Sequence, residues 1–292
     1  MPRFCRQIAG LLASALIWAA PIVRADTPTS ASPAISVAIP LSGRIEQGGT
    51  ATGFVPKGTT SLKLDGAIVP FAADGRFLIG FGRDAAPTAH LVATLGNGKQ
   101  ITQSITIATH QWQIERVDTP MRPAAIPSAE FERLRADEIA QMVTARQTKV
   151  DSNGWRQHFI WPTTGRLSGL FGSQRIYQGV AGSYHGGVDV ARPSGTPIVA
   201  PADGVVILAA KETPFTLEGH LLMIDHGMGL TSAFLHLSRI DVAVGDLITQ
   251  GQALGTIGTS GRSTGPHLHW GMKWQDQRID PQMLVPPMPQ AN

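Results

Sequence analysis

Cysteine is nearly absent from this sequence, because the chain contains one residue of this type, Cys5. A disulfide framework is therefore excluded, and the fold must depend on its apolar core alone. Cys5 also precedes the N-terminal apolar run, whereas a lipid-attachment cysteine would follow such a run. Charge is sparse as well: 15% of the residues are charged, against 42% hydrophobic. This composition is typical of a globular protein and excludes a largely disordered one.

The N-terminus has the features of an export signal. Two arginines precede an apolar run over about residues 8–20, and Val23 and Ala25 fit the small-residue pattern before a cleavage site. We predict a signal peptide over 1–25 and a flexible Pro/Ser/Thr-rich lead over 26–34. The alternative is a retained membrane anchor, but the run is short for a span. We therefore expect no stable membrane span after cleavage.

The net charge of +3 depends on this N-terminal segment. Residues 1–25 hold three arginines and no acidic residue, so 24 Lys+Arg less three leaves 21, which equals the 21 Asp+Glu. The exported chain would then be neutral overall. Its charge gives no basis for a nucleic-acid partner.

Glycine and proline are frequent, with 32 and 21 residues, and they separate short apolar or alternating runs. This pattern predicts an all-β fold with many short strands. We expect a small β-sandwich over 35–115 and a second β-rich domain over 155–286.

The clearest helical segment lies between these domains, over 127–149. Ser128 is a candidate N-cap, and acidic residues crowd the first turns. Phe131, Leu134 and Met142 can share one apolar face, with Ile139 at its edge. We interpret this helix as a connector between the two domains.

Histidine is concentrated in the second β-rich segment, where two patterns stand out. "HLH" places His267 and His269 on the same face of a strand, about 6–7 Å apart, which suits two groups that flank one metal ion or one reacting atom. "HGGVD" places His185 four residues before Asp189. In a straight strand that pair would be about 13 Å apart, so we predict a glycine-bent turn before the strand that carries Asp189.

These residue types match the needs of a catalytic zinc site, which takes three protein ligands and leaves one position for water. His185, Asp189 and one histidine of the H-x-H pair would supply such a set. The other histidine would lie beside the open position, where a general acid or base is needed. His236, in "AFLHLS", is a second candidate for that role.

The segments "HGGVD", "IDHGMGLTSAFLHLS" and "TGPHLHWGM", with the lead "WPTTGRLSGLFGSQR", resemble the lysostaphin/LytM-type zinc endopeptidases of bacterial cell walls over about residues 160–285. The resemblance implies a lysostaphin-type peptidase domain with one zinc ion. The implied zinc ligands are His185, Asp189 and His269, and the implied catalytic histidines are His236 and His267. A tyrosine near the first ligand assists the oxyanion in some relatives, which makes Tyr177 and Tyr184 candidates for substrate binding.

The resemblance further implies hydrolysis of peptide cross-links in peptidoglycan, either D-alanyl–diaminopimelate links or glycine bridges. We expect this in the periplasm, with a secreted or wall-associated enzyme as the alternative location. A non-enzymatic wall-binding activator of another hydrolase is the alternative function, although such relatives have usually lost the ligands. A latent enzyme, more active when shortened to begin near Trp155, is another alternative. The sequence identifies no regulatory protein partner.

Overall fold

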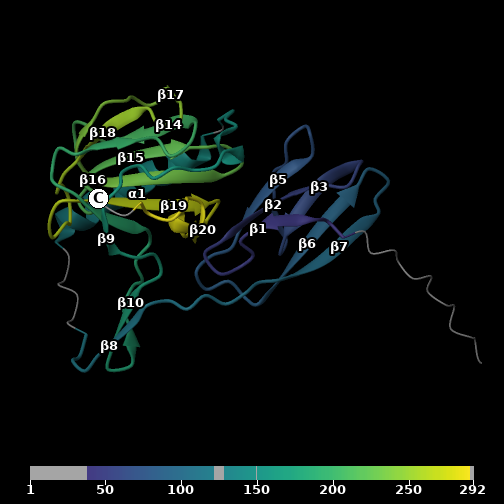
Figure 1. The fold of residues 1–292 in the computed structure, drawn as a ribbon, viewed down its shortest axis with the longest axis horizontal. Helices are drawn as coiled ribbons and strands as arrows, with labels where there is room; N and C mark the ends of the chain where they lie inside the picture. The colour runs from purple at the N-terminus through teal and green to yellow at the C-terminus, as the bar shows by residue number, and fades with distance from the viewer. Residues whose placement is uncertain (1–37, 122–127, 149, 290–292) are drawn as a thin grey trace, which may run out of the picture. The chain divides into compact units, whose positions relative to one another are not determined.

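Strands dominate the computed structural model, which describes residues 38–121, 128–148 and 150–289 (Figure 1). The predicted all-β class is confirmed. The predicted signal peptide and flexible lead lie outside the described residues. Contacts divide the chain into Met1–Ile35 and Ser36–Asn292, and every described residue belongs to the second unit. In this described part, no helix has the length and apolar character needed to cross a membrane.

Seven strands of the N-terminal region form two antiparallel sheets. The side chains of Leu62, Phe77 and Leu91 are fully buried and belong to one hydrophobic core that both sheets share, as expected for a small β-sandwich. The three-stranded sheet has the order β1 (Leu41–Gly43), β2 (Thr50–Phe54), β5 (Arg76–Gly80), and the four-stranded sheet has the order β4 (Ala67–Ile68), β3 (Thr59–Leu64), β6 (Thr88–Leu95), β7 (Gln100–Thr106).

The next strand leaves the sandwich. β8 (Ile114–Val117) pairs in parallel with β10 (Gln174–Tyr177), which in turn pairs with β11 (Val180–Ala181). The pairing joins segments about 60 residues apart, so it crosses the boundary at 115 that the sequence indicates.

The remaining strands build a ten-stranded sheet that carries the candidate site. On its strand β19, the residues at 268, 270, 272 and 274 are buried, so those at 267, 269, 271 and 273 face the other side. The main path of the sheet is β17 (Leu247–Ile248), β14 (Gly204–Ala209), β15 (His220–Asp225), β16 (Leu230–Ile240), β19 (His267–Trp274), β12 (Val188–Ala191), β9 (Arg166–Gly169), with β13 (Pro197–Val199), β18 (Ala253–Ile257) and β20 (Gln277–Ile279) attached to it.

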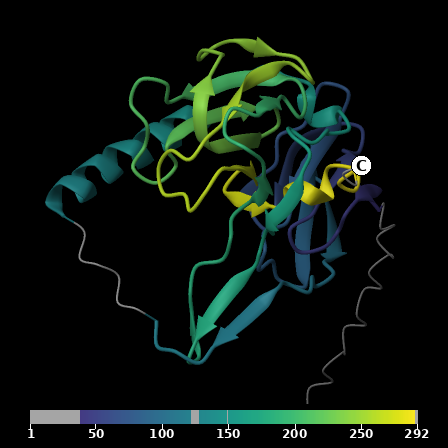
Figure 2. The same cartoon turned by 60° about the vertical axis from the view of Figure 1, so that its left-hand side comes forward.

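One long helix, α1 (Ala129–Gln147), confirms the predicted helical segment (Figure 2). The Ser128 hydroxyl accepts a hydrogen bond from the Phe131 N–H at 3.0 Å, so the expected N-cap is present. A small hydrophobic cluster that includes Ala145 and Met142 of α1 also contains Leu221 and Met223 of β15. Through this cluster α1 packs on the ten-stranded sheet.

The predicted apolar face of α1 is buried only in part: Phe131 and Met142 are half-buried, and Met142 packs in the small cluster on the sheet. Leu134 and Ile139 are 36% and 46% exposed, whereas Glu138 is buried. Glu138 accepts hydrogen bonds from the N–H and the hydroxyl of Thr216, and it forms an ion pair with Arg135 at 2.9 Å. A polar network therefore fixes the orientation of the helix together with the small apolar cluster.

Asp280, between β20 and the short helix η2 (Pro281–Met283), provides a test of buried charge. Its carboxylate accepts a hydrogen bond from the Gln282 N–H at 2.9 Å, and burial raises its pKa to about 6. The unfolded value is about 3.9, so the folded state holds this proton more tightly. Its contribution to stability is therefore complete below about pH 4 and is lost as the pH rises through 6.

We expect Asp280→Asn to be more stable than the wild type at pH 8, by up to about 3 kcal/mol, because the amide keeps an acceptor oxygen without the charge. The difference should shrink as the pH falls toward 4. Urea unfolding of both chains at pH 4, 6 and 8 measures it. A difference that does not change with pH would contradict the assignment.

Candidate metal centre

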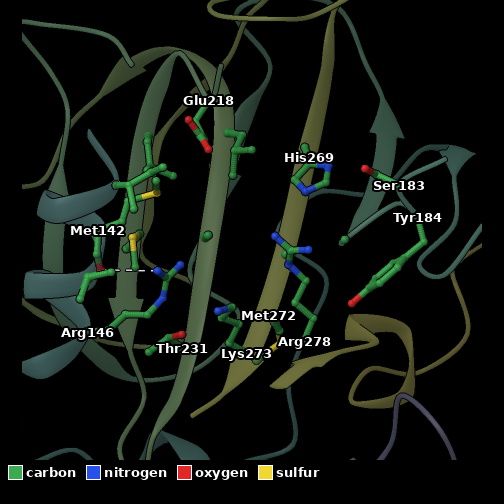
Figure 3. Close-up of a pocket in the computed structure, with 18 of the residues that line it drawn as sticks. Met142, Arg146, Ser183, Tyr184, Glu218, Thr231, His269, Met272, Lys273 and Arg278 are labelled. Carbon is green, nitrogen blue, oxygen red and sulfur yellow. Dashed lines mark hydrogen bonds between the residues drawn. The ribbon is translucent and has the colours of Figure 1, made fainter. Parts of the chain in front are cut away.

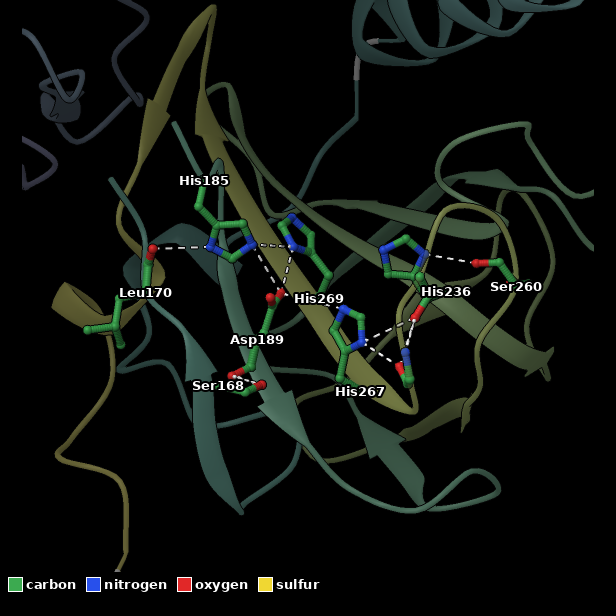
Figure 4. A network of polar contacts seen from close by, with 10 residues as sticks. Ser168, Leu170, His185, Asp189, His236, Ser260, His267 and His269 are labelled. Carbon is green, nitrogen blue, oxygen red and sulfur yellow. Dashed lines mark hydrogen bonds and ion pairs between the residues drawn. The ribbon is translucent and has the colours of Figure 1, made fainter. Parts of the chain in front are cut away.

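Two neighbouring strands bring the first two candidate ligands together. Asp189 of β12 lies directly opposite His269 of β19 in the antiparallel register. Directly opposite residues project from the same face of a sheet. The His269 Nδ1 consequently lies 2.8 Å from the Asp189 Oδ1 (Figure 4).

The third candidate, His185, reaches this pair through the expected bend before β12. Its Nε2 lies 3.2 Å from the Asp189 Oδ1 and 3.1 Å from the His269 Nδ1. Glycine is needed in the bend, because a Cβ at Gly187 would lie 2.7 Å from the His269 Nε2. Gly187 thus allows the chain to pass close to the His269 imidazole.

The three donor atoms fit a zinc ion. Tetrahedral zinc with ligand bonds of about 2.0–2.1 Å has ligand–ligand distances of about 3.3 Å, close to the 2.8–3.2 Å found here. The His185 Nδ1 lies 3.1 Å from the Leu170 carbonyl oxygen, which can only accept a hydrogen bond. That contact places the proton on Nδ1 and leaves the Nε2 lone pair free for a metal. Two imidazoles and one carboxylate form a common catalytic zinc set.

The local electrostatics favour an ionised Asp189 and a neutral His269 in the donor set. Burial would raise the pKa of Asp189, but its close polar and charge interactions with His185 and His269 together lower it more, so the carboxylate is charged. Burial lowers the pKa of His269, which favours the neutral imidazole. For His185 burial acts in the same direction, but the contact with the Asp189 carboxylate, its negative charge and the Leu170 carbonyl together outweigh burial and raise the pKa.

His236 lies beside the donor set on β16. Its ring centroid is 5.0 Å from that of His267 and 6.2 Å from that of His269. The Nδ1 donates to the Ser260 carbonyl at 2.9 Å, which leaves Nε2 unprotonated. Burial lowers the pKa of His236 and keeps the ring neutral at pH 7. Its backbone has φ of +62°, an unusual value for a non-glycine residue and one that often accompanies functional sites.

His267 completes the cluster from the start of β19. Its Nδ1 donates to the Gly265 carbonyl at 2.8 Å, and its Nε2 lies 3.8 Å from the Asp189 Oδ1. His267 is thus near the donors but outside the set of three. The structure brings all five polar residues chosen from the sequence into one cluster (Figure 4). Three of them, His185, Asp189 and His269, have the geometry of metal ligands, and His236 and His267 lie beside these three.

A cavity of about 540 Å³ adjoins His269, between α1 and the outer face of strands β15, β16 and β19 (Figure 3). Of the two candidate tyrosines, Tyr184 lines this cavity and Tyr177 does not. Tyr184 is held between aromatic and cationic neighbours, because its ring centroid is 6.0 Å from that of Phe171 and 4.8 Å from the Arg83 guanidinium carbon. The cavity is large enough for several residues of a peptide.

Sequence reasoning missed two kinds of functional group. The backbone carbonyls of Leu170, Ser260 and Gly265 orient the histidines, and no side-chain pattern reports them. Lys273 and Arg278 line the cavity as well. The alternation of side chains along a strand could have identified Lys273. In "HLHWGMK" it lies four residues after His269 and six after His267, so all three side chains lie on the same face.

Comparison with known proteins identifies the domain. Residues 183–281 match the model of peptidase family M23. The chain is 42% identical over 86 residues to the peptidoglycan DD-endopeptidase ShyA of Vibrio cholerae. The aligned segment covers 30% of this chain and 19% of that protein. It spans about a quarter or less of the length of the curated relatives that it matches.

Two solved structures extend the comparison. A structure from Pseudomonas aeruginosa described as a peptidase M23 has a TM-score of 0.64 and 26% identity, and the match covers 83% of this chain and 96% of that one. The catalytic domain of the prophage-encoded M23 protein EnpA from Enterococcus faecalis is 30% identical, with 42% of this chain and 88% of that chain covered and a TM-score of 0.32. The matched segment contains the three motifs that supply the five clustered residues, "HGGVD", "HLS" and "HLH". Residues 183–281 of this chain are therefore a domain of peptidase family M23.

Proposed function

We propose that this chain is a zinc-dependent endopeptidase that hydrolyses peptide cross-links of bacterial peptidoglycan. The observation that carries the proposal is the convergence of three metal donors with two further histidines beside a cavity of peptide size. A relative named as a peptidoglycan DD-endopeptidase supports the choice of substrate. The complete donor set makes a non-enzymatic activator the weaker alternative.

Zinc would be held by the His185 Nε2, the Asp189 Oδ1 and the His269 Nδ1. When bound, it would polarise the scissile carbonyl and lower the pKa of water. The hydrogen bond between the His185 Nδ1 and the Leu170 carbonyl fixes the ring so that Nε2 faces the other donors.

His236 and His267 supply the proton transfers in this proposal. Hydrolysis adds water across the peptide bond, so one proton leaves the water and one reaches the departing amine. His236 is neutral with a free Nε2, which suits acceptance of a proton. His267 has the same tautomer, held by the Gly265 carbonyl. Once protonated, either ring can stabilise the developing oxyanion.

We place this activity outside the cytoplasm, in the periplasm, on the basis of the N-terminal signal features. The substrate, a cross-linked cell wall, lies in the same compartment. Exported chains of this kind need no disulfide when the core is large, and the described core contains a long series of fully buried aliphatic and aromatic side chains.

Metal removal tests the proposal directly. The purified chain is incubated with isolated peptidoglycan, and the released fragments are identified by mass spectrometry. We expect cross-linked dimers to become monomers, this conversion to stop after chelation, and about one equivalent of zinc per chain to restore it. A chain that binds zinc but leaves all cross-links intact would instead favour the non-enzymatic alternative.

A further inference from the structure

Three cationic side chains gather in the cavity beside His269: Arg146 of α1, Lys273 of β19 and Arg278 of β20 (Figure 3). We call them the cation cluster. Within residues 38–121, 128–148 and 150–289, no carboxylate lies within ion-pair distance of any of the three, whereas Arg135, Arg156, Arg175 and Arg239 each have such a partner. The cluster is therefore a local excess of positive charge next to the candidate metal centre.

The sheet places two of these charges directly against each other. Lys273 and Arg278 are opposite residues in the antiparallel pairing of β19 with β20. Like charges in such a pair are destabilising. Lys273 also shares a strand face with His269, four residues away or about 13 Å along the strand. The repulsive pair thus lies on the same face of the sheet as a candidate metal ligand.

Arg146 adds the third charge from the helix. Its Nε is buried and has no hydrogen-bond partner among the described residues, and its Nη1 donates only to the Met142 carbonyl, at 3.4 Å. Burial and the charge of Arg278 both lower the pKa of Arg146. Burial, Arg146 and Arg278 likewise lower the pKa of Lys273. Arg146 and Lys273 are thus partly desolvated beside like charge, whereas Arg278 is exposed at the edge of the cluster.

Two carboxylates face the cluster without neutralising it. Asp276 is exposed in the turn between β19 and β20. Glu218 is occupied by Arg135, whose two Nη atoms lie 2.6 and 2.8 Å from its carboxylate oxygens. The three cations, among them Arg146 with its unpartnered Nε–H, therefore remain open to an anionic ligand. A carboxylate matches their N–H donors best.

We infer that the cation cluster binds a carboxylate of the substrate's peptide stem, so that the site selects acidic cross-links of the diaminopimelate type over uncharged glycine bridges. This inference rests on the proposed function. An extended peptide advances about 3.3–3.6 Å per residue, so about four residues span the distance from His269 to Lys273. A stem carboxylate up to about four residues from the scissile bond can therefore reach the cluster while the bond lies at the metal centre.

Two matched substrates test the inference. One is a cross-linked stem-peptide dimer with free diaminopimelate carboxylates, and the other is the same dimer with those groups amidated. We expect wild-type kcat/KM to be at least about tenfold higher on the acidic dimer, the effect of one charge-assisted contact. The Lys273→Met/Arg278→Gln double variant should lose this preference through KM and keep its rate on the amidated dimer.

Control variants separate binding from folding. Lys273→Arg should keep the preference, and Arg239→Gln, at an exposed arginine paired with Asp241, should behave as the wild type. The melting temperature of Lys273→Met should be equal or higher, because the change relieves repulsion between opposite residues. Equal losses on both dimers would show a structural role and overturn the inference.

The remaining outcomes distinguish the two proposals. Equal cleavage of both dimers by the wild type and by the double variant would overturn the inference and leave the proposed function standing. Cleavage of neither dimer by zinc-loaded wild type would count against the proposed function. In that case, calorimetry with the acidic and amidated stem peptides still tests the cluster, because equal affinities would overturn it.

Discussion

Replacing His269 with alanine is expected to remove bound zinc and to lower hydrolysis of peptidoglycan by at least about a thousandfold. His269 Nδ1 contacts both other donors, at 2.8 Å to the Asp189 Oδ1 and 3.1 Å to the His185 Nε2. Without it two donors remain, whereas catalytic zinc sites use three. Loss of an outer-shell partner already costs 10- to 100-fold, and loss of a direct ligand costs more.

Zinc content by atomic spectroscopy and dimer conversion by mass spectrometry measure this effect. His158→Ala is the matched control, because His158 is an exposed histidine of the same domain outside the cluster. It should keep both zinc and activity. A His269→Ala chain with full zinc content and full activity would show that the metal, or the chemistry, lies elsewhere.

The candidate site was predictable from the sequence where strand geometry alone decides. The shared face of His267 and His269 follows from the two-residue period of a strand, and the structure places both rings near Asp189. Spacing did not decide which of the two belongs to the donor set, because both are on the same face. The resemblance indicated His269. The structure gives a physical reason for this choice, because Asp189 and His269 are directly opposite each other on neighbouring strands.

Contacts between distant segments were not predictable in this way. The sequence indicated α1 and its N-cap, since both depend on neighbouring residues. The buried face of α1 depends instead on Thr216 and Glu218, about 80 residues later, which bind Glu138 and Arg135. The cation cluster has the same origin, because it combines one residue of α1 with two residues of a distant hairpin.

The replacement His236→Asn is expected to abolish most of the hydrolysis while leaving the zinc in place. His236 is outside the donor set, with its ring 5.0 Å from that of His267, so its loss removes no ligand. An amide cannot carry a proton at neutral pH, and loss of a general acid or base costs about 10²- to 10⁴-fold. Zinc content, melting temperature and kcat, measured on the same preparation, test the three parts of this expectation.

Asparagine is the informative replacement because of the backbone at this position. The φ of His236 is +62°, a conformation that asparagine adopts more readily than alanine does. A loss of activity with unchanged stability then reports on the imidazole rather than on strain in β16. If zinc were lost together with activity, His236 would be a positioning residue for the donors. If activity stayed within tenfold of the wild type, His267 alone would carry the proton transfers, because it has the same tautomer and its ring lies 5.0 Å from that of His236.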